Sequence, residues 1–206
     1  MTGNEVVYVV DDEETVRRAV ARLVRSVGLR AETFPSVAAF LARQAGDHPA
    51  CLVLDVRMPG QSGLELQAIM GAGQRSLPII FVTGRGTVPM SVRAMKGGAL
   101  DFLQKPFDSQ ELLDAIQRAL QKSREGRAAE SDQARVEGRL ATLTPREREV
   151  LRLVVKGLLN KQIADELGAA EKTVKVHRGR VMRKMEADSV PDLVRMTQAV
   201  GFPRSA

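Results

Sequence analysis

Short apolar runs alternate with amphipathic stretches over the first 121 residues of the chain. The run Val6–Val10 is continuous and apolar, which is typical of a strand buried on both faces of a sheet. The amphipathic stretches place apolar residues at helical spacing, and Gly28 is positioned to end the first of them. Strict alternation of five strands and five helices predicts an α/β, doubly wound, five-stranded parallel sheet. The predicted strands cover 6–10, 31–34, 51–54, 79–82 and 99–103, and the predicted helices 16–27, 36–45, 64–72, 87–97 and 108–122.

A polar segment, 122–141, separates this pattern from the rest of the chain. It is rich in Ala, Arg and Glu, which favours a helical linker that continues the preceding helix. Gly126 and Gly138 each weaken a helix by about 1 kcal/mol, so a flexible tether is the alternative.

Residues 142–206 predict a small all-α domain with clear helix start signals. Thr144 and Glu147 form a capping box around a proline at the first helical position. Asn160 is placed to cap a second helix, a third covers about 171–185, and a fourth follows Ser189. Two short helices followed by a basic one predict a helix-turn-helix. The expected division is therefore 1–121, the linker 122–141, and 142–206.

The composition fits a soluble globular protein, with 44% apolar and 27% charged residues. No stretch approaches 18 uncharged apolar residues, so we expect neither a membrane-spanning helix nor a membrane partner. The first ten residues lack the basic start of a signal peptide. The single cysteine, Cys51, fits a reducing compartment, and a cytoplasmic location is expected.

The positive charge is concentrated at one end. Residues 1–121 hold thirteen basic and thirteen acidic residues, whereas residues 122–206 hold eighteen and twelve, so the whole excess of +6 lies there. Six basic residues and no acid occur over 172–184, which indicates a polyanion partner such as double-stranded DNA. A solvated basic helix face is the alternative.

Polar residues follow four of the predicted strands. Asp11 and Asp12 come after the first, Asp55 after the third, Thr83 after the fourth and Lys105 after the fifth. Ligands of open parallel sheets bind outside these strand ends. Three converging carboxylates repel one another unless a cation is present, and hard oxygen ligands suit Mg²⁺. A lysine and a hydroxyl suit phosphoryl oxygens, so the set predicts a site that places a phosphate on or beside a carboxylate. For the first two aspartates alone, capping of the following helix is the alternative.

Four motifs resemble the receiver domain of two-component response regulators over residues 5–121: VVDDE at 9–13, LDVRMPG at 54–60, TG at 83–84 and KPF at 105–107. The resemblance implies that Asp55 accepts a phosphoryl group from a phosphohistidine of a sensor histidine kinase. Thr83 and Lys105 would contact the phosphoryl oxygens, Phe102 would turn inward with Thr83, and the bond from Lys105 to Pro106 would be cis. The implied Mg²⁺ ligands are Asp11, Asp12, Asp55 and the backbone carbonyl of Arg57.

The last 65 residues resemble the LuxR-type helix-turn-helix, through LTPREREVL at 143–151, Gly157, NKQIA at 160–164 and TVKVHR at 173–178. The two resemblances together are those of a NarL/FixJ-type response regulator, closest to the FixJ-type branch. In the basic helix, Val174, Val181 and Met185 share one face and are expected in the core. The expected DNA contacts are Lys161, Lys172, Thr173, Lys175, Val176 and Arg178, with Arg180, Arg183 and Lys184 on phosphates.

Some positions depart from the family's usual pattern, and others are ones that vary within it. The basic helix begins after Ala169 and Ala170 rather than a serine, and Gly179 stands where relatives often carry a longer contact residue. Arg57 and Arg85 flank Asp55 and the fourth strand, at positions that tune phosphate lifetime in the family. We expect them to weaken Mg²⁺ binding and slow dephosphorylation.

The sequence therefore predicts a transcription regulator switched by phosphorylation, which forms a homodimer when phosphorylated and has RNA polymerase as a further candidate partner. Its only reactions would be its own phosphotransfer and dephosphorylation. One alternative is a Mg²⁺-dependent aspartyl-phosphate phosphotransferase or hydrolase, but its motif needs a second aspartate where Arg57 stands. The other is a constitutive DNA-binding protein with a silent receiver.

Overall fold

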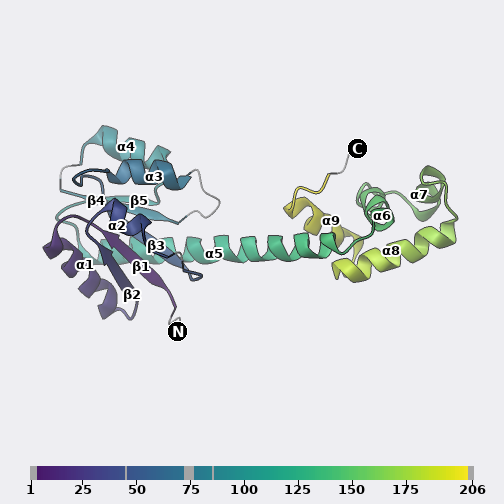
Figure 1. Cartoon of the computed structure of the whole chain (residues 1–206), viewed down its shortest axis with the longest axis horizontal. Coiled ribbons are helices and arrows are strands. Elements are labelled where there is room, and N and C mark those ends of the chain that lie inside the picture. Colours follow the sequence, from purple (N-terminus) through teal and green to yellow (C-terminus); the bar gives the residue numbers. More distant parts are fainter. Residues whose placement is uncertain (1–3, 45, 72–76, 85, 204–206) are drawn as a thin grey trace. The chain divides into compact units, whose positions relative to one another are not determined.

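The computed structural model describes residues 4–44, 46–71, 77–84 and 86–203. The chain divides into two compact units, Met1–Arg127 and Ala128–Ala206 (Figure 1). Within the described residues, no helix is long and apolar enough to cross a membrane.

The first unit is a parallel sheet with helices on both faces, in the strand order β2-β1-β3-β4-β5. This confirms the predicted doubly wound fold. The strands are β1 (Val6–Val10), β2 (Arg30–Phe34), β3 (Ala50–Asp55), β4 (Ile79–Thr83) and β5 (Asp101–Gln104). The helices are α1 (Glu14–Ser26), α2 (Val37–Leu41), α3 (Gly63–Gly71), α4 (Val88–Lys96) and α5 (Ser109–Ala141).

Side chains of β1 alternate between two apolar cores. Val7 and Val9 pack with residues of α1 and α5, while Val6, Tyr8 and Val10 pack with residues of α2, α3 and α4. Because both faces are covered, the central strands β1, β3 and β4 are apolar except where β3 and β4 end in Asp55 and Thr83, which makes them recognisable in the sequence. Cys51 is fully buried in β3, and burial raises the pKa of its thiol well above the ordinary value.

Several predicted boundaries shift in the structure. The helix predicted over 36–45 ends at Leu41. The strand predicted from residue 99 begins at Asp101, because the Ala99 N–H bonds the Ala94 carbonyl and closes α4 instead. The helix predicted over 108–122 and the segment 122–141 form the single 33-residue helix α5.

The second unit contains the end of α5 together with α6 (Pro145–Val155), α7 (Asn160–Glu166), α8 (Glu171–Met185) and α9 (Val190–Ala199). The capping box of Thr144 and Glu147 is present at the start of α6. The core contains Val174, Val181 and Met185, as their spacing predicts, and Val136 of α5 packs against it.

The prediction that Asn160 caps α7 is wrong. The cap position is Leu159, whose backbone N–H donates to Gln162 Oε1 (2.8 Å), and Asn160 is the first helical residue. The side-chain oxygen of Asn160 instead accepts a hydrogen bond from Arg178 of α8 (3.0 Å). The side chain of Asn160, which the local pattern assigned to capping, is therefore bonded to Arg178 of another helix.

Candidate functional site

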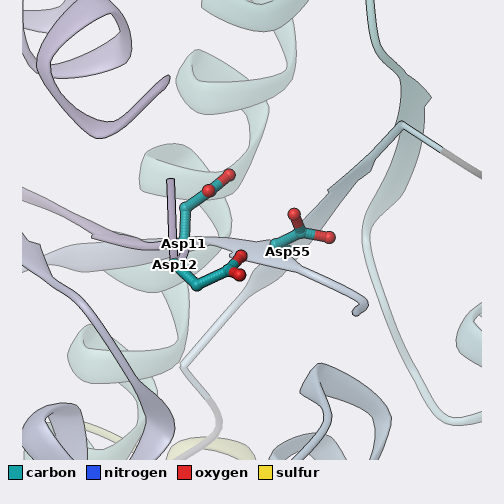
Figure 2. Close-up of side chains that lie close together, drawn as sticks. All are labelled: Asp11, Asp12 and Asp55. Carbon is teal, nitrogen blue, oxygen red and sulfur yellow. The ribbon is translucent and has the colours of Figure 1, made fainter. Parts of the chain in front are cut away.

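Three carboxylates gather at the carboxyl edge of the sheet in the first unit (Figure 2). Asp11 and Asp12 follow β1, and Asp55 is the last residue of β3. Each offers one oxygen atom, and these oxygens lie within 4.8 Å of one another. The sheet topology places β1 beside β3, so residues 44 positions apart meet as the sequence predicts.

Lys105 lies directly between two of these carboxylates. Its Nζ donates to Asp11 Oδ2 (2.6 Å) and to Asp55 Oδ2 (2.9 Å), and its side chain is only 14% exposed. Its backbone N–H bonds the Thr83 carbonyl (2.8 Å), which extends the pairing of β4 with β5 and fixes the position of the lysine. The bond to Pro106 is cis, as the resemblance implies.

The second oxygen of each buried carboxylate is held by the backbone. Asp11 Oδ1 accepts from the Glu13 N–H (2.9 Å), and Asp55 Oδ1 accepts from the Arg57 N–H (3.0 Å). Asp11 and Asp55 are buried, while Asp12 is exposed. Two carboxylates are thus oriented by the fold and one is open to solvent.

Burial and charge work against each other at this site. Burial raises the pKa of the Asp11 carboxyl, and the hydrogen bond from Lys105 opposes that shift without cancelling it. For Lys105, burial alone would lower the pKa, but the hydrogen bonds and charges of Asp11 and Asp55 outweigh it and raise the pKa. The raised pKa keeps Lys105 as an ammonium ion, which bonds two of the three carboxylates.

A glycine that the sequence prediction missed brings α3 against the site. A Cβ at Gly63, the first residue of α3, would lie 2.3 Å from the Asp55 carbonyl oxygen. Only glycine therefore fits this close approach. The sequence indicates this role only weakly, because a single glycine shortly after a proline-glycine turn is typical of a loop.

Thr83 and Phe102 lie on neighbouring strands near the same edge. Thr83 is buried, and Phe102 is partly buried with its ring 6.3 Å from that of Phe81. A Cβ at Gly86 would lie 3.1 Å from the Phe102 ring and 3.2 Å from the Thr83 methyl group, so both side chains border the start of the loop after β4.

Two arginines, Arg57 and Arg85, are predicted from the sequence to adjust the site. Arg57 is exposed, and its guanidinium lies 3.7 Å from the sulfur of Met90 in α4. Arg85 lies outside the described residues. Their effect on Mg²⁺ and phosphate lifetime stays a prediction.

In the second unit, α8 presents most of the predicted DNA contacts to solvent. Arg178 is half-buried because it bonds Asn160, and Val176 is 48% exposed despite its apolar side chain. The helix begins after Ala170 without a side-chain cap. The exposed members of the predicted set are Lys161 on α7 and Lys172, Thr173, Lys175, Val176, Arg180 and Arg183 on α8.

Lys184 has a partner within its own unit that the sequence prediction missed. Its Nζ donates to Glu147 Oε2 (2.7 Å) and to the Thr142 carbonyl (2.9 Å). The hydrogen bond from Lys184, together with the Thr144 N–H, lowers the pKa of Glu147. The capping glutamate of α6 thus also holds the end of α8, and this lysine has less freedom to meet a phosphate than its neighbours.

A doubly wound unit with an acidic crevice, followed by a helix-turn-helix unit, defines the class of response regulators that act on DNA. Comparison with known protein families supports this assignment. The response regulator receiver domain matches residues 7–117, and the luxR family of bacterial regulatory proteins matches residues 141–197. The chain belongs to the response regulator family, as a transcriptional regulator with a receiver and a LuxR-type DNA-binding domain.

Individual relatives match over almost the whole chain. Nodulation protein W of Bradyrhizobium diazoefficiens is 50% identical over 197 residues, which cover 96% of this chain and 87% of that protein. Transcriptional regulatory protein FixJ of Rhizobium meliloti is 45% identical over 196 residues, covering 95% and 96%. Among solved structures, response regulator StyR has 48% identity and a TM-score of 0.84, covering 95% of this chain and 98% of that one.

Proposed function

We propose that Asp55 is the phosphoryl acceptor of a transcription switch, and that its donor is a phosphohistidine of a sensor histidine kinase. In the transfer, the P–N bond to the histidine breaks as a P–O bond forms to a carboxylate oxygen of Asp55. The observation that carries the proposal is the double hydrogen bond of Lys105, because it places an ammonium ion beside the oxygen that would carry the phosphoryl group.

The residues present fit Mg²⁺. Three carboxylates within reach of one another offer hard oxygen donors, and the Lys105 ammonium group bonds only two of them. The proposed ligands are Asp11, Asp12, Asp55 and the backbone carbonyl of Arg57. When bound, the ion would neutralise charge on the phosphoryl oxygens during transfer.

The proposed switch uses the residues at the neighbouring strand ends. A phosphoryl group adds about −1.5 to −2 charge. Lys105 would bond it instead of Asp11, Thr83 would turn toward it, and Phe102 would follow into the space that Thr83 leaves. Changing an inactive to active ratio from 1:99 to 99:1 needs about 5.5 kcal/mol of differential stabilisation, and such charged hydrogen bonds are strong enough to contribute a large part of it.

The proposed output is a phosphorylation-dependent homodimer that binds double-stranded DNA at paired half-sites and regulates transcription, with RNA polymerase as a further partner. Support comes from the exposed basic side chains of α8 and from the positive charge of the second unit, which holds fifteen basic and eleven acidic residues. Among the α8 residues, Lys172, Lys175, Val176 and Arg178 would meet base edges, and Arg180 and Arg183 would meet phosphates. Lys161, Thr173 and Lys184 complete the proposed set.

The test compares the wild-type chain with Asp55→Asn. We expect the variant to lose labelling by radioactive acetyl phosphate and to lose the shift in elution volume caused by beryllofluoride and Mg²⁺, because the amide cannot act as the acceptor. Asp47→Asn is the control, since Asp47 is an exposed aspartate of the loop before β3 whose ion pair with Arg127 contributes little. Equal labelling of wild type and Asp55→Asn would exclude Asp55 as the acceptor.

A further inference from the structure

The end of α8 is held by an arginine from the last turn of α5. Arg139 Nη1 donates to the Met185 carbonyl (3.1 Å), and its Nη2 pairs with the Glu186 carboxylate. The arginine side chain is 18% exposed, so it is largely enclosed by the unit it holds. Carbonyl groups at a helix C-terminus lack partners within the helix, and a positive charge there is favourable.

The backbone at this point is in a conformation that needs such support. Glu186 has φ 50° and ψ 42°, and among the described residues it is the one non-glycine residue with a positive φ. Side chains rarely adopt this left-handed conformation, which persists where the surroundings fix it. Arg139 bonds the carbonyl before Glu186 and the carboxylate of Glu186 itself, so it holds both sides of the turn.

Apart from the core side chains Val174, Val181 and Met185, little within α8 itself fixes its orientation. Its first turn has no side-chain cap, and Gly179 in its middle weakens the helix. The buried side chains set its inner face, while the polar bonds that hold it run to other elements. These bonds include Arg178 with Asn160, Lys184 with Glu147 and the Thr142 carbonyl, and Arg139 with Met185 and Glu186.

We propose that Arg139 is a positioning residue for DNA recognition: it fixes the end of α8, so that the exposed side chains of this helix enter the groove in one orientation. The end of α5 then contributes to DNA recognition, in addition to linking the two units. The inference rests on the proposed role of α8 as the helix that reads DNA. Arg139 itself touches no base in this proposal, and its action is carried by the turn at Glu186.

The experiment measures DNA binding by the full chain with two probes. One is a duplex selected in vitro from random sequence by the wild-type chain, and the other is a scrambled duplex of equal length and composition. We expect Arg139→Ala to lower the ratio of selected to scrambled affinity by about tenfold, the size of one lost base-pair preference. Binding to the scrambled duplex and its salt slope should stay near the wild-type values, because phosphate contacts are retained.

Arg135→Ala is the matched control. Arg135 lies one turn earlier on α5, carries the same charge and pairs with Asp132 of the same helix, with both side chains exposed. We expect this variant to keep the wild-type specificity ratio. Measurements are made at a temperature where circular dichroism shows each variant to be fully folded, so that loss of stability does not enter the ratio.

Two further variants separate positioning from general destabilisation. Arg139→Lys keeps the charge and one donor group, and we expect it to restore part of the ratio. Glu186→Gly removes the carboxylate but allows the left-handed conformation freely, so Arg139→Ala should cost less specificity in that background than in the wild type.

Other outcomes would overturn the inference in distinct ways. Equal weakening on both duplexes with a salt slope smaller by about one would make Arg139 a phosphate contact. An unchanged ratio with a lower melting temperature would make it a stabilising residue only. If the wild-type chain selects no preferred duplex, the proposed function of α8 fails, whereas normal selection with an unaffected Arg139→Ala variant removes this inference alone.

Discussion

Lys105 acts as a cation tethered inside an anionic crevice. Its ammonium group bonds two of the three carboxylates that a divalent ion would need, and the chain cannot release it into solvent as it could a free ion. An incoming Mg²⁺ must therefore compete with a charge that is always present at the site. The same lysine that would favour the phosphorylated state in the proposed switch would thus oppose metal binding before phosphorylation.

Replacing Lys105 should separate these two effects. We expect Lys105→Ala to bind Mg²⁺ at least about tenfold more tightly, a gain of about 1.4 kcal/mol, because one competing charge is removed. Labelling of Asp55 by acetyl phosphate should remain detectable, while phosphorylation should no longer drive dimerisation. Titration calorimetry and elution volume measure the two properties.

Lys96→Ala serves as the control for Lys105→Ala, since Lys96 is an exposed lysine in the last turn of α4. It should leave Mg²⁺ affinity unchanged. If Lys105→Ala bound Mg²⁺ as weakly as the wild type, the ammonium group would not compete for the carboxylates in solution.

The DNA contacts proposed for helix α8 are of two kinds. Lys175 and Val176 are exposed in its first half, where a recognition helix reaches base edges. Gly179 offers no side chain one turn later, and Arg183 is exposed near the end. Base reading should therefore be concentrated in a short segment, and one unit alone should bind specific DNA weakly.

Substitutions at the two ends of α8 should give different signatures. Lys175→Ala should flatten the preference among sequences by about 1–3 kcal/mol, because lysine can bond guanine edges. Arg183→Ala should weaken all sequences alike and reduce the salt slope by about one. Anisotropy titrations on selected and scrambled duplexes at several salt concentrations distinguish the two. Uniform weakening by Lys175→Ala would make it a phosphate contact and show that the predicted helix register is wrong.

The sequence predicts elements well where the signal is local. Continuous apolar runs identify the central strands β1, β3 and β4, and the parallel sheet brings Asp11, Asp55 and Lys105 together because strand ends share one edge. The capping box of α6 is equally evident from the sequence, because Thr144 and Glu147 are only three residues apart. Each of these features depends on residues close in sequence or on a general rule of sheet topology.

The features missed by the sequence depend on pairs that form only in the folded unit. Asn160 does not cap α7 as expected, because its side chain accepts a hydrogen bond from Arg178, eighteen residues away. Lys184 and Arg139 each have partners more than thirty residues away, and their charge alone looked like one more solvated or DNA-facing side chain. Patterns along the chain do not specify which partner a long charged side chain reaches.

At the scale of the whole molecule, charge is divided between the two predicted tasks. The first 121 residues carry no net charge, while the rest carry the full +6. Attraction to a nucleic acid is therefore expected from the residues after 121, and phosphorylation would add negative charge to a segment that has no net charge. The proposed switch then works through conformation and dimerisation and not through removal of a basic patch.

The stretch of α5 from residue 128 to 135 is exposed at every position. Its helical form rests on its own backbone hydrogen bonds, and such unpacked helices open readily. Limited digestion with trypsin should therefore cut the chain first in this stretch and release two resistant fragments.

Gly126→Ala, whose new methyl group meets no atom within 4 Å, should slow that cut about fivefold by stabilising the helix by about 1 kcal/mol. Gly179→Ala in α8, equally free of steric conflict, should leave the rate unchanged, so protease sensitivity reports directly on the helix that joins the two units.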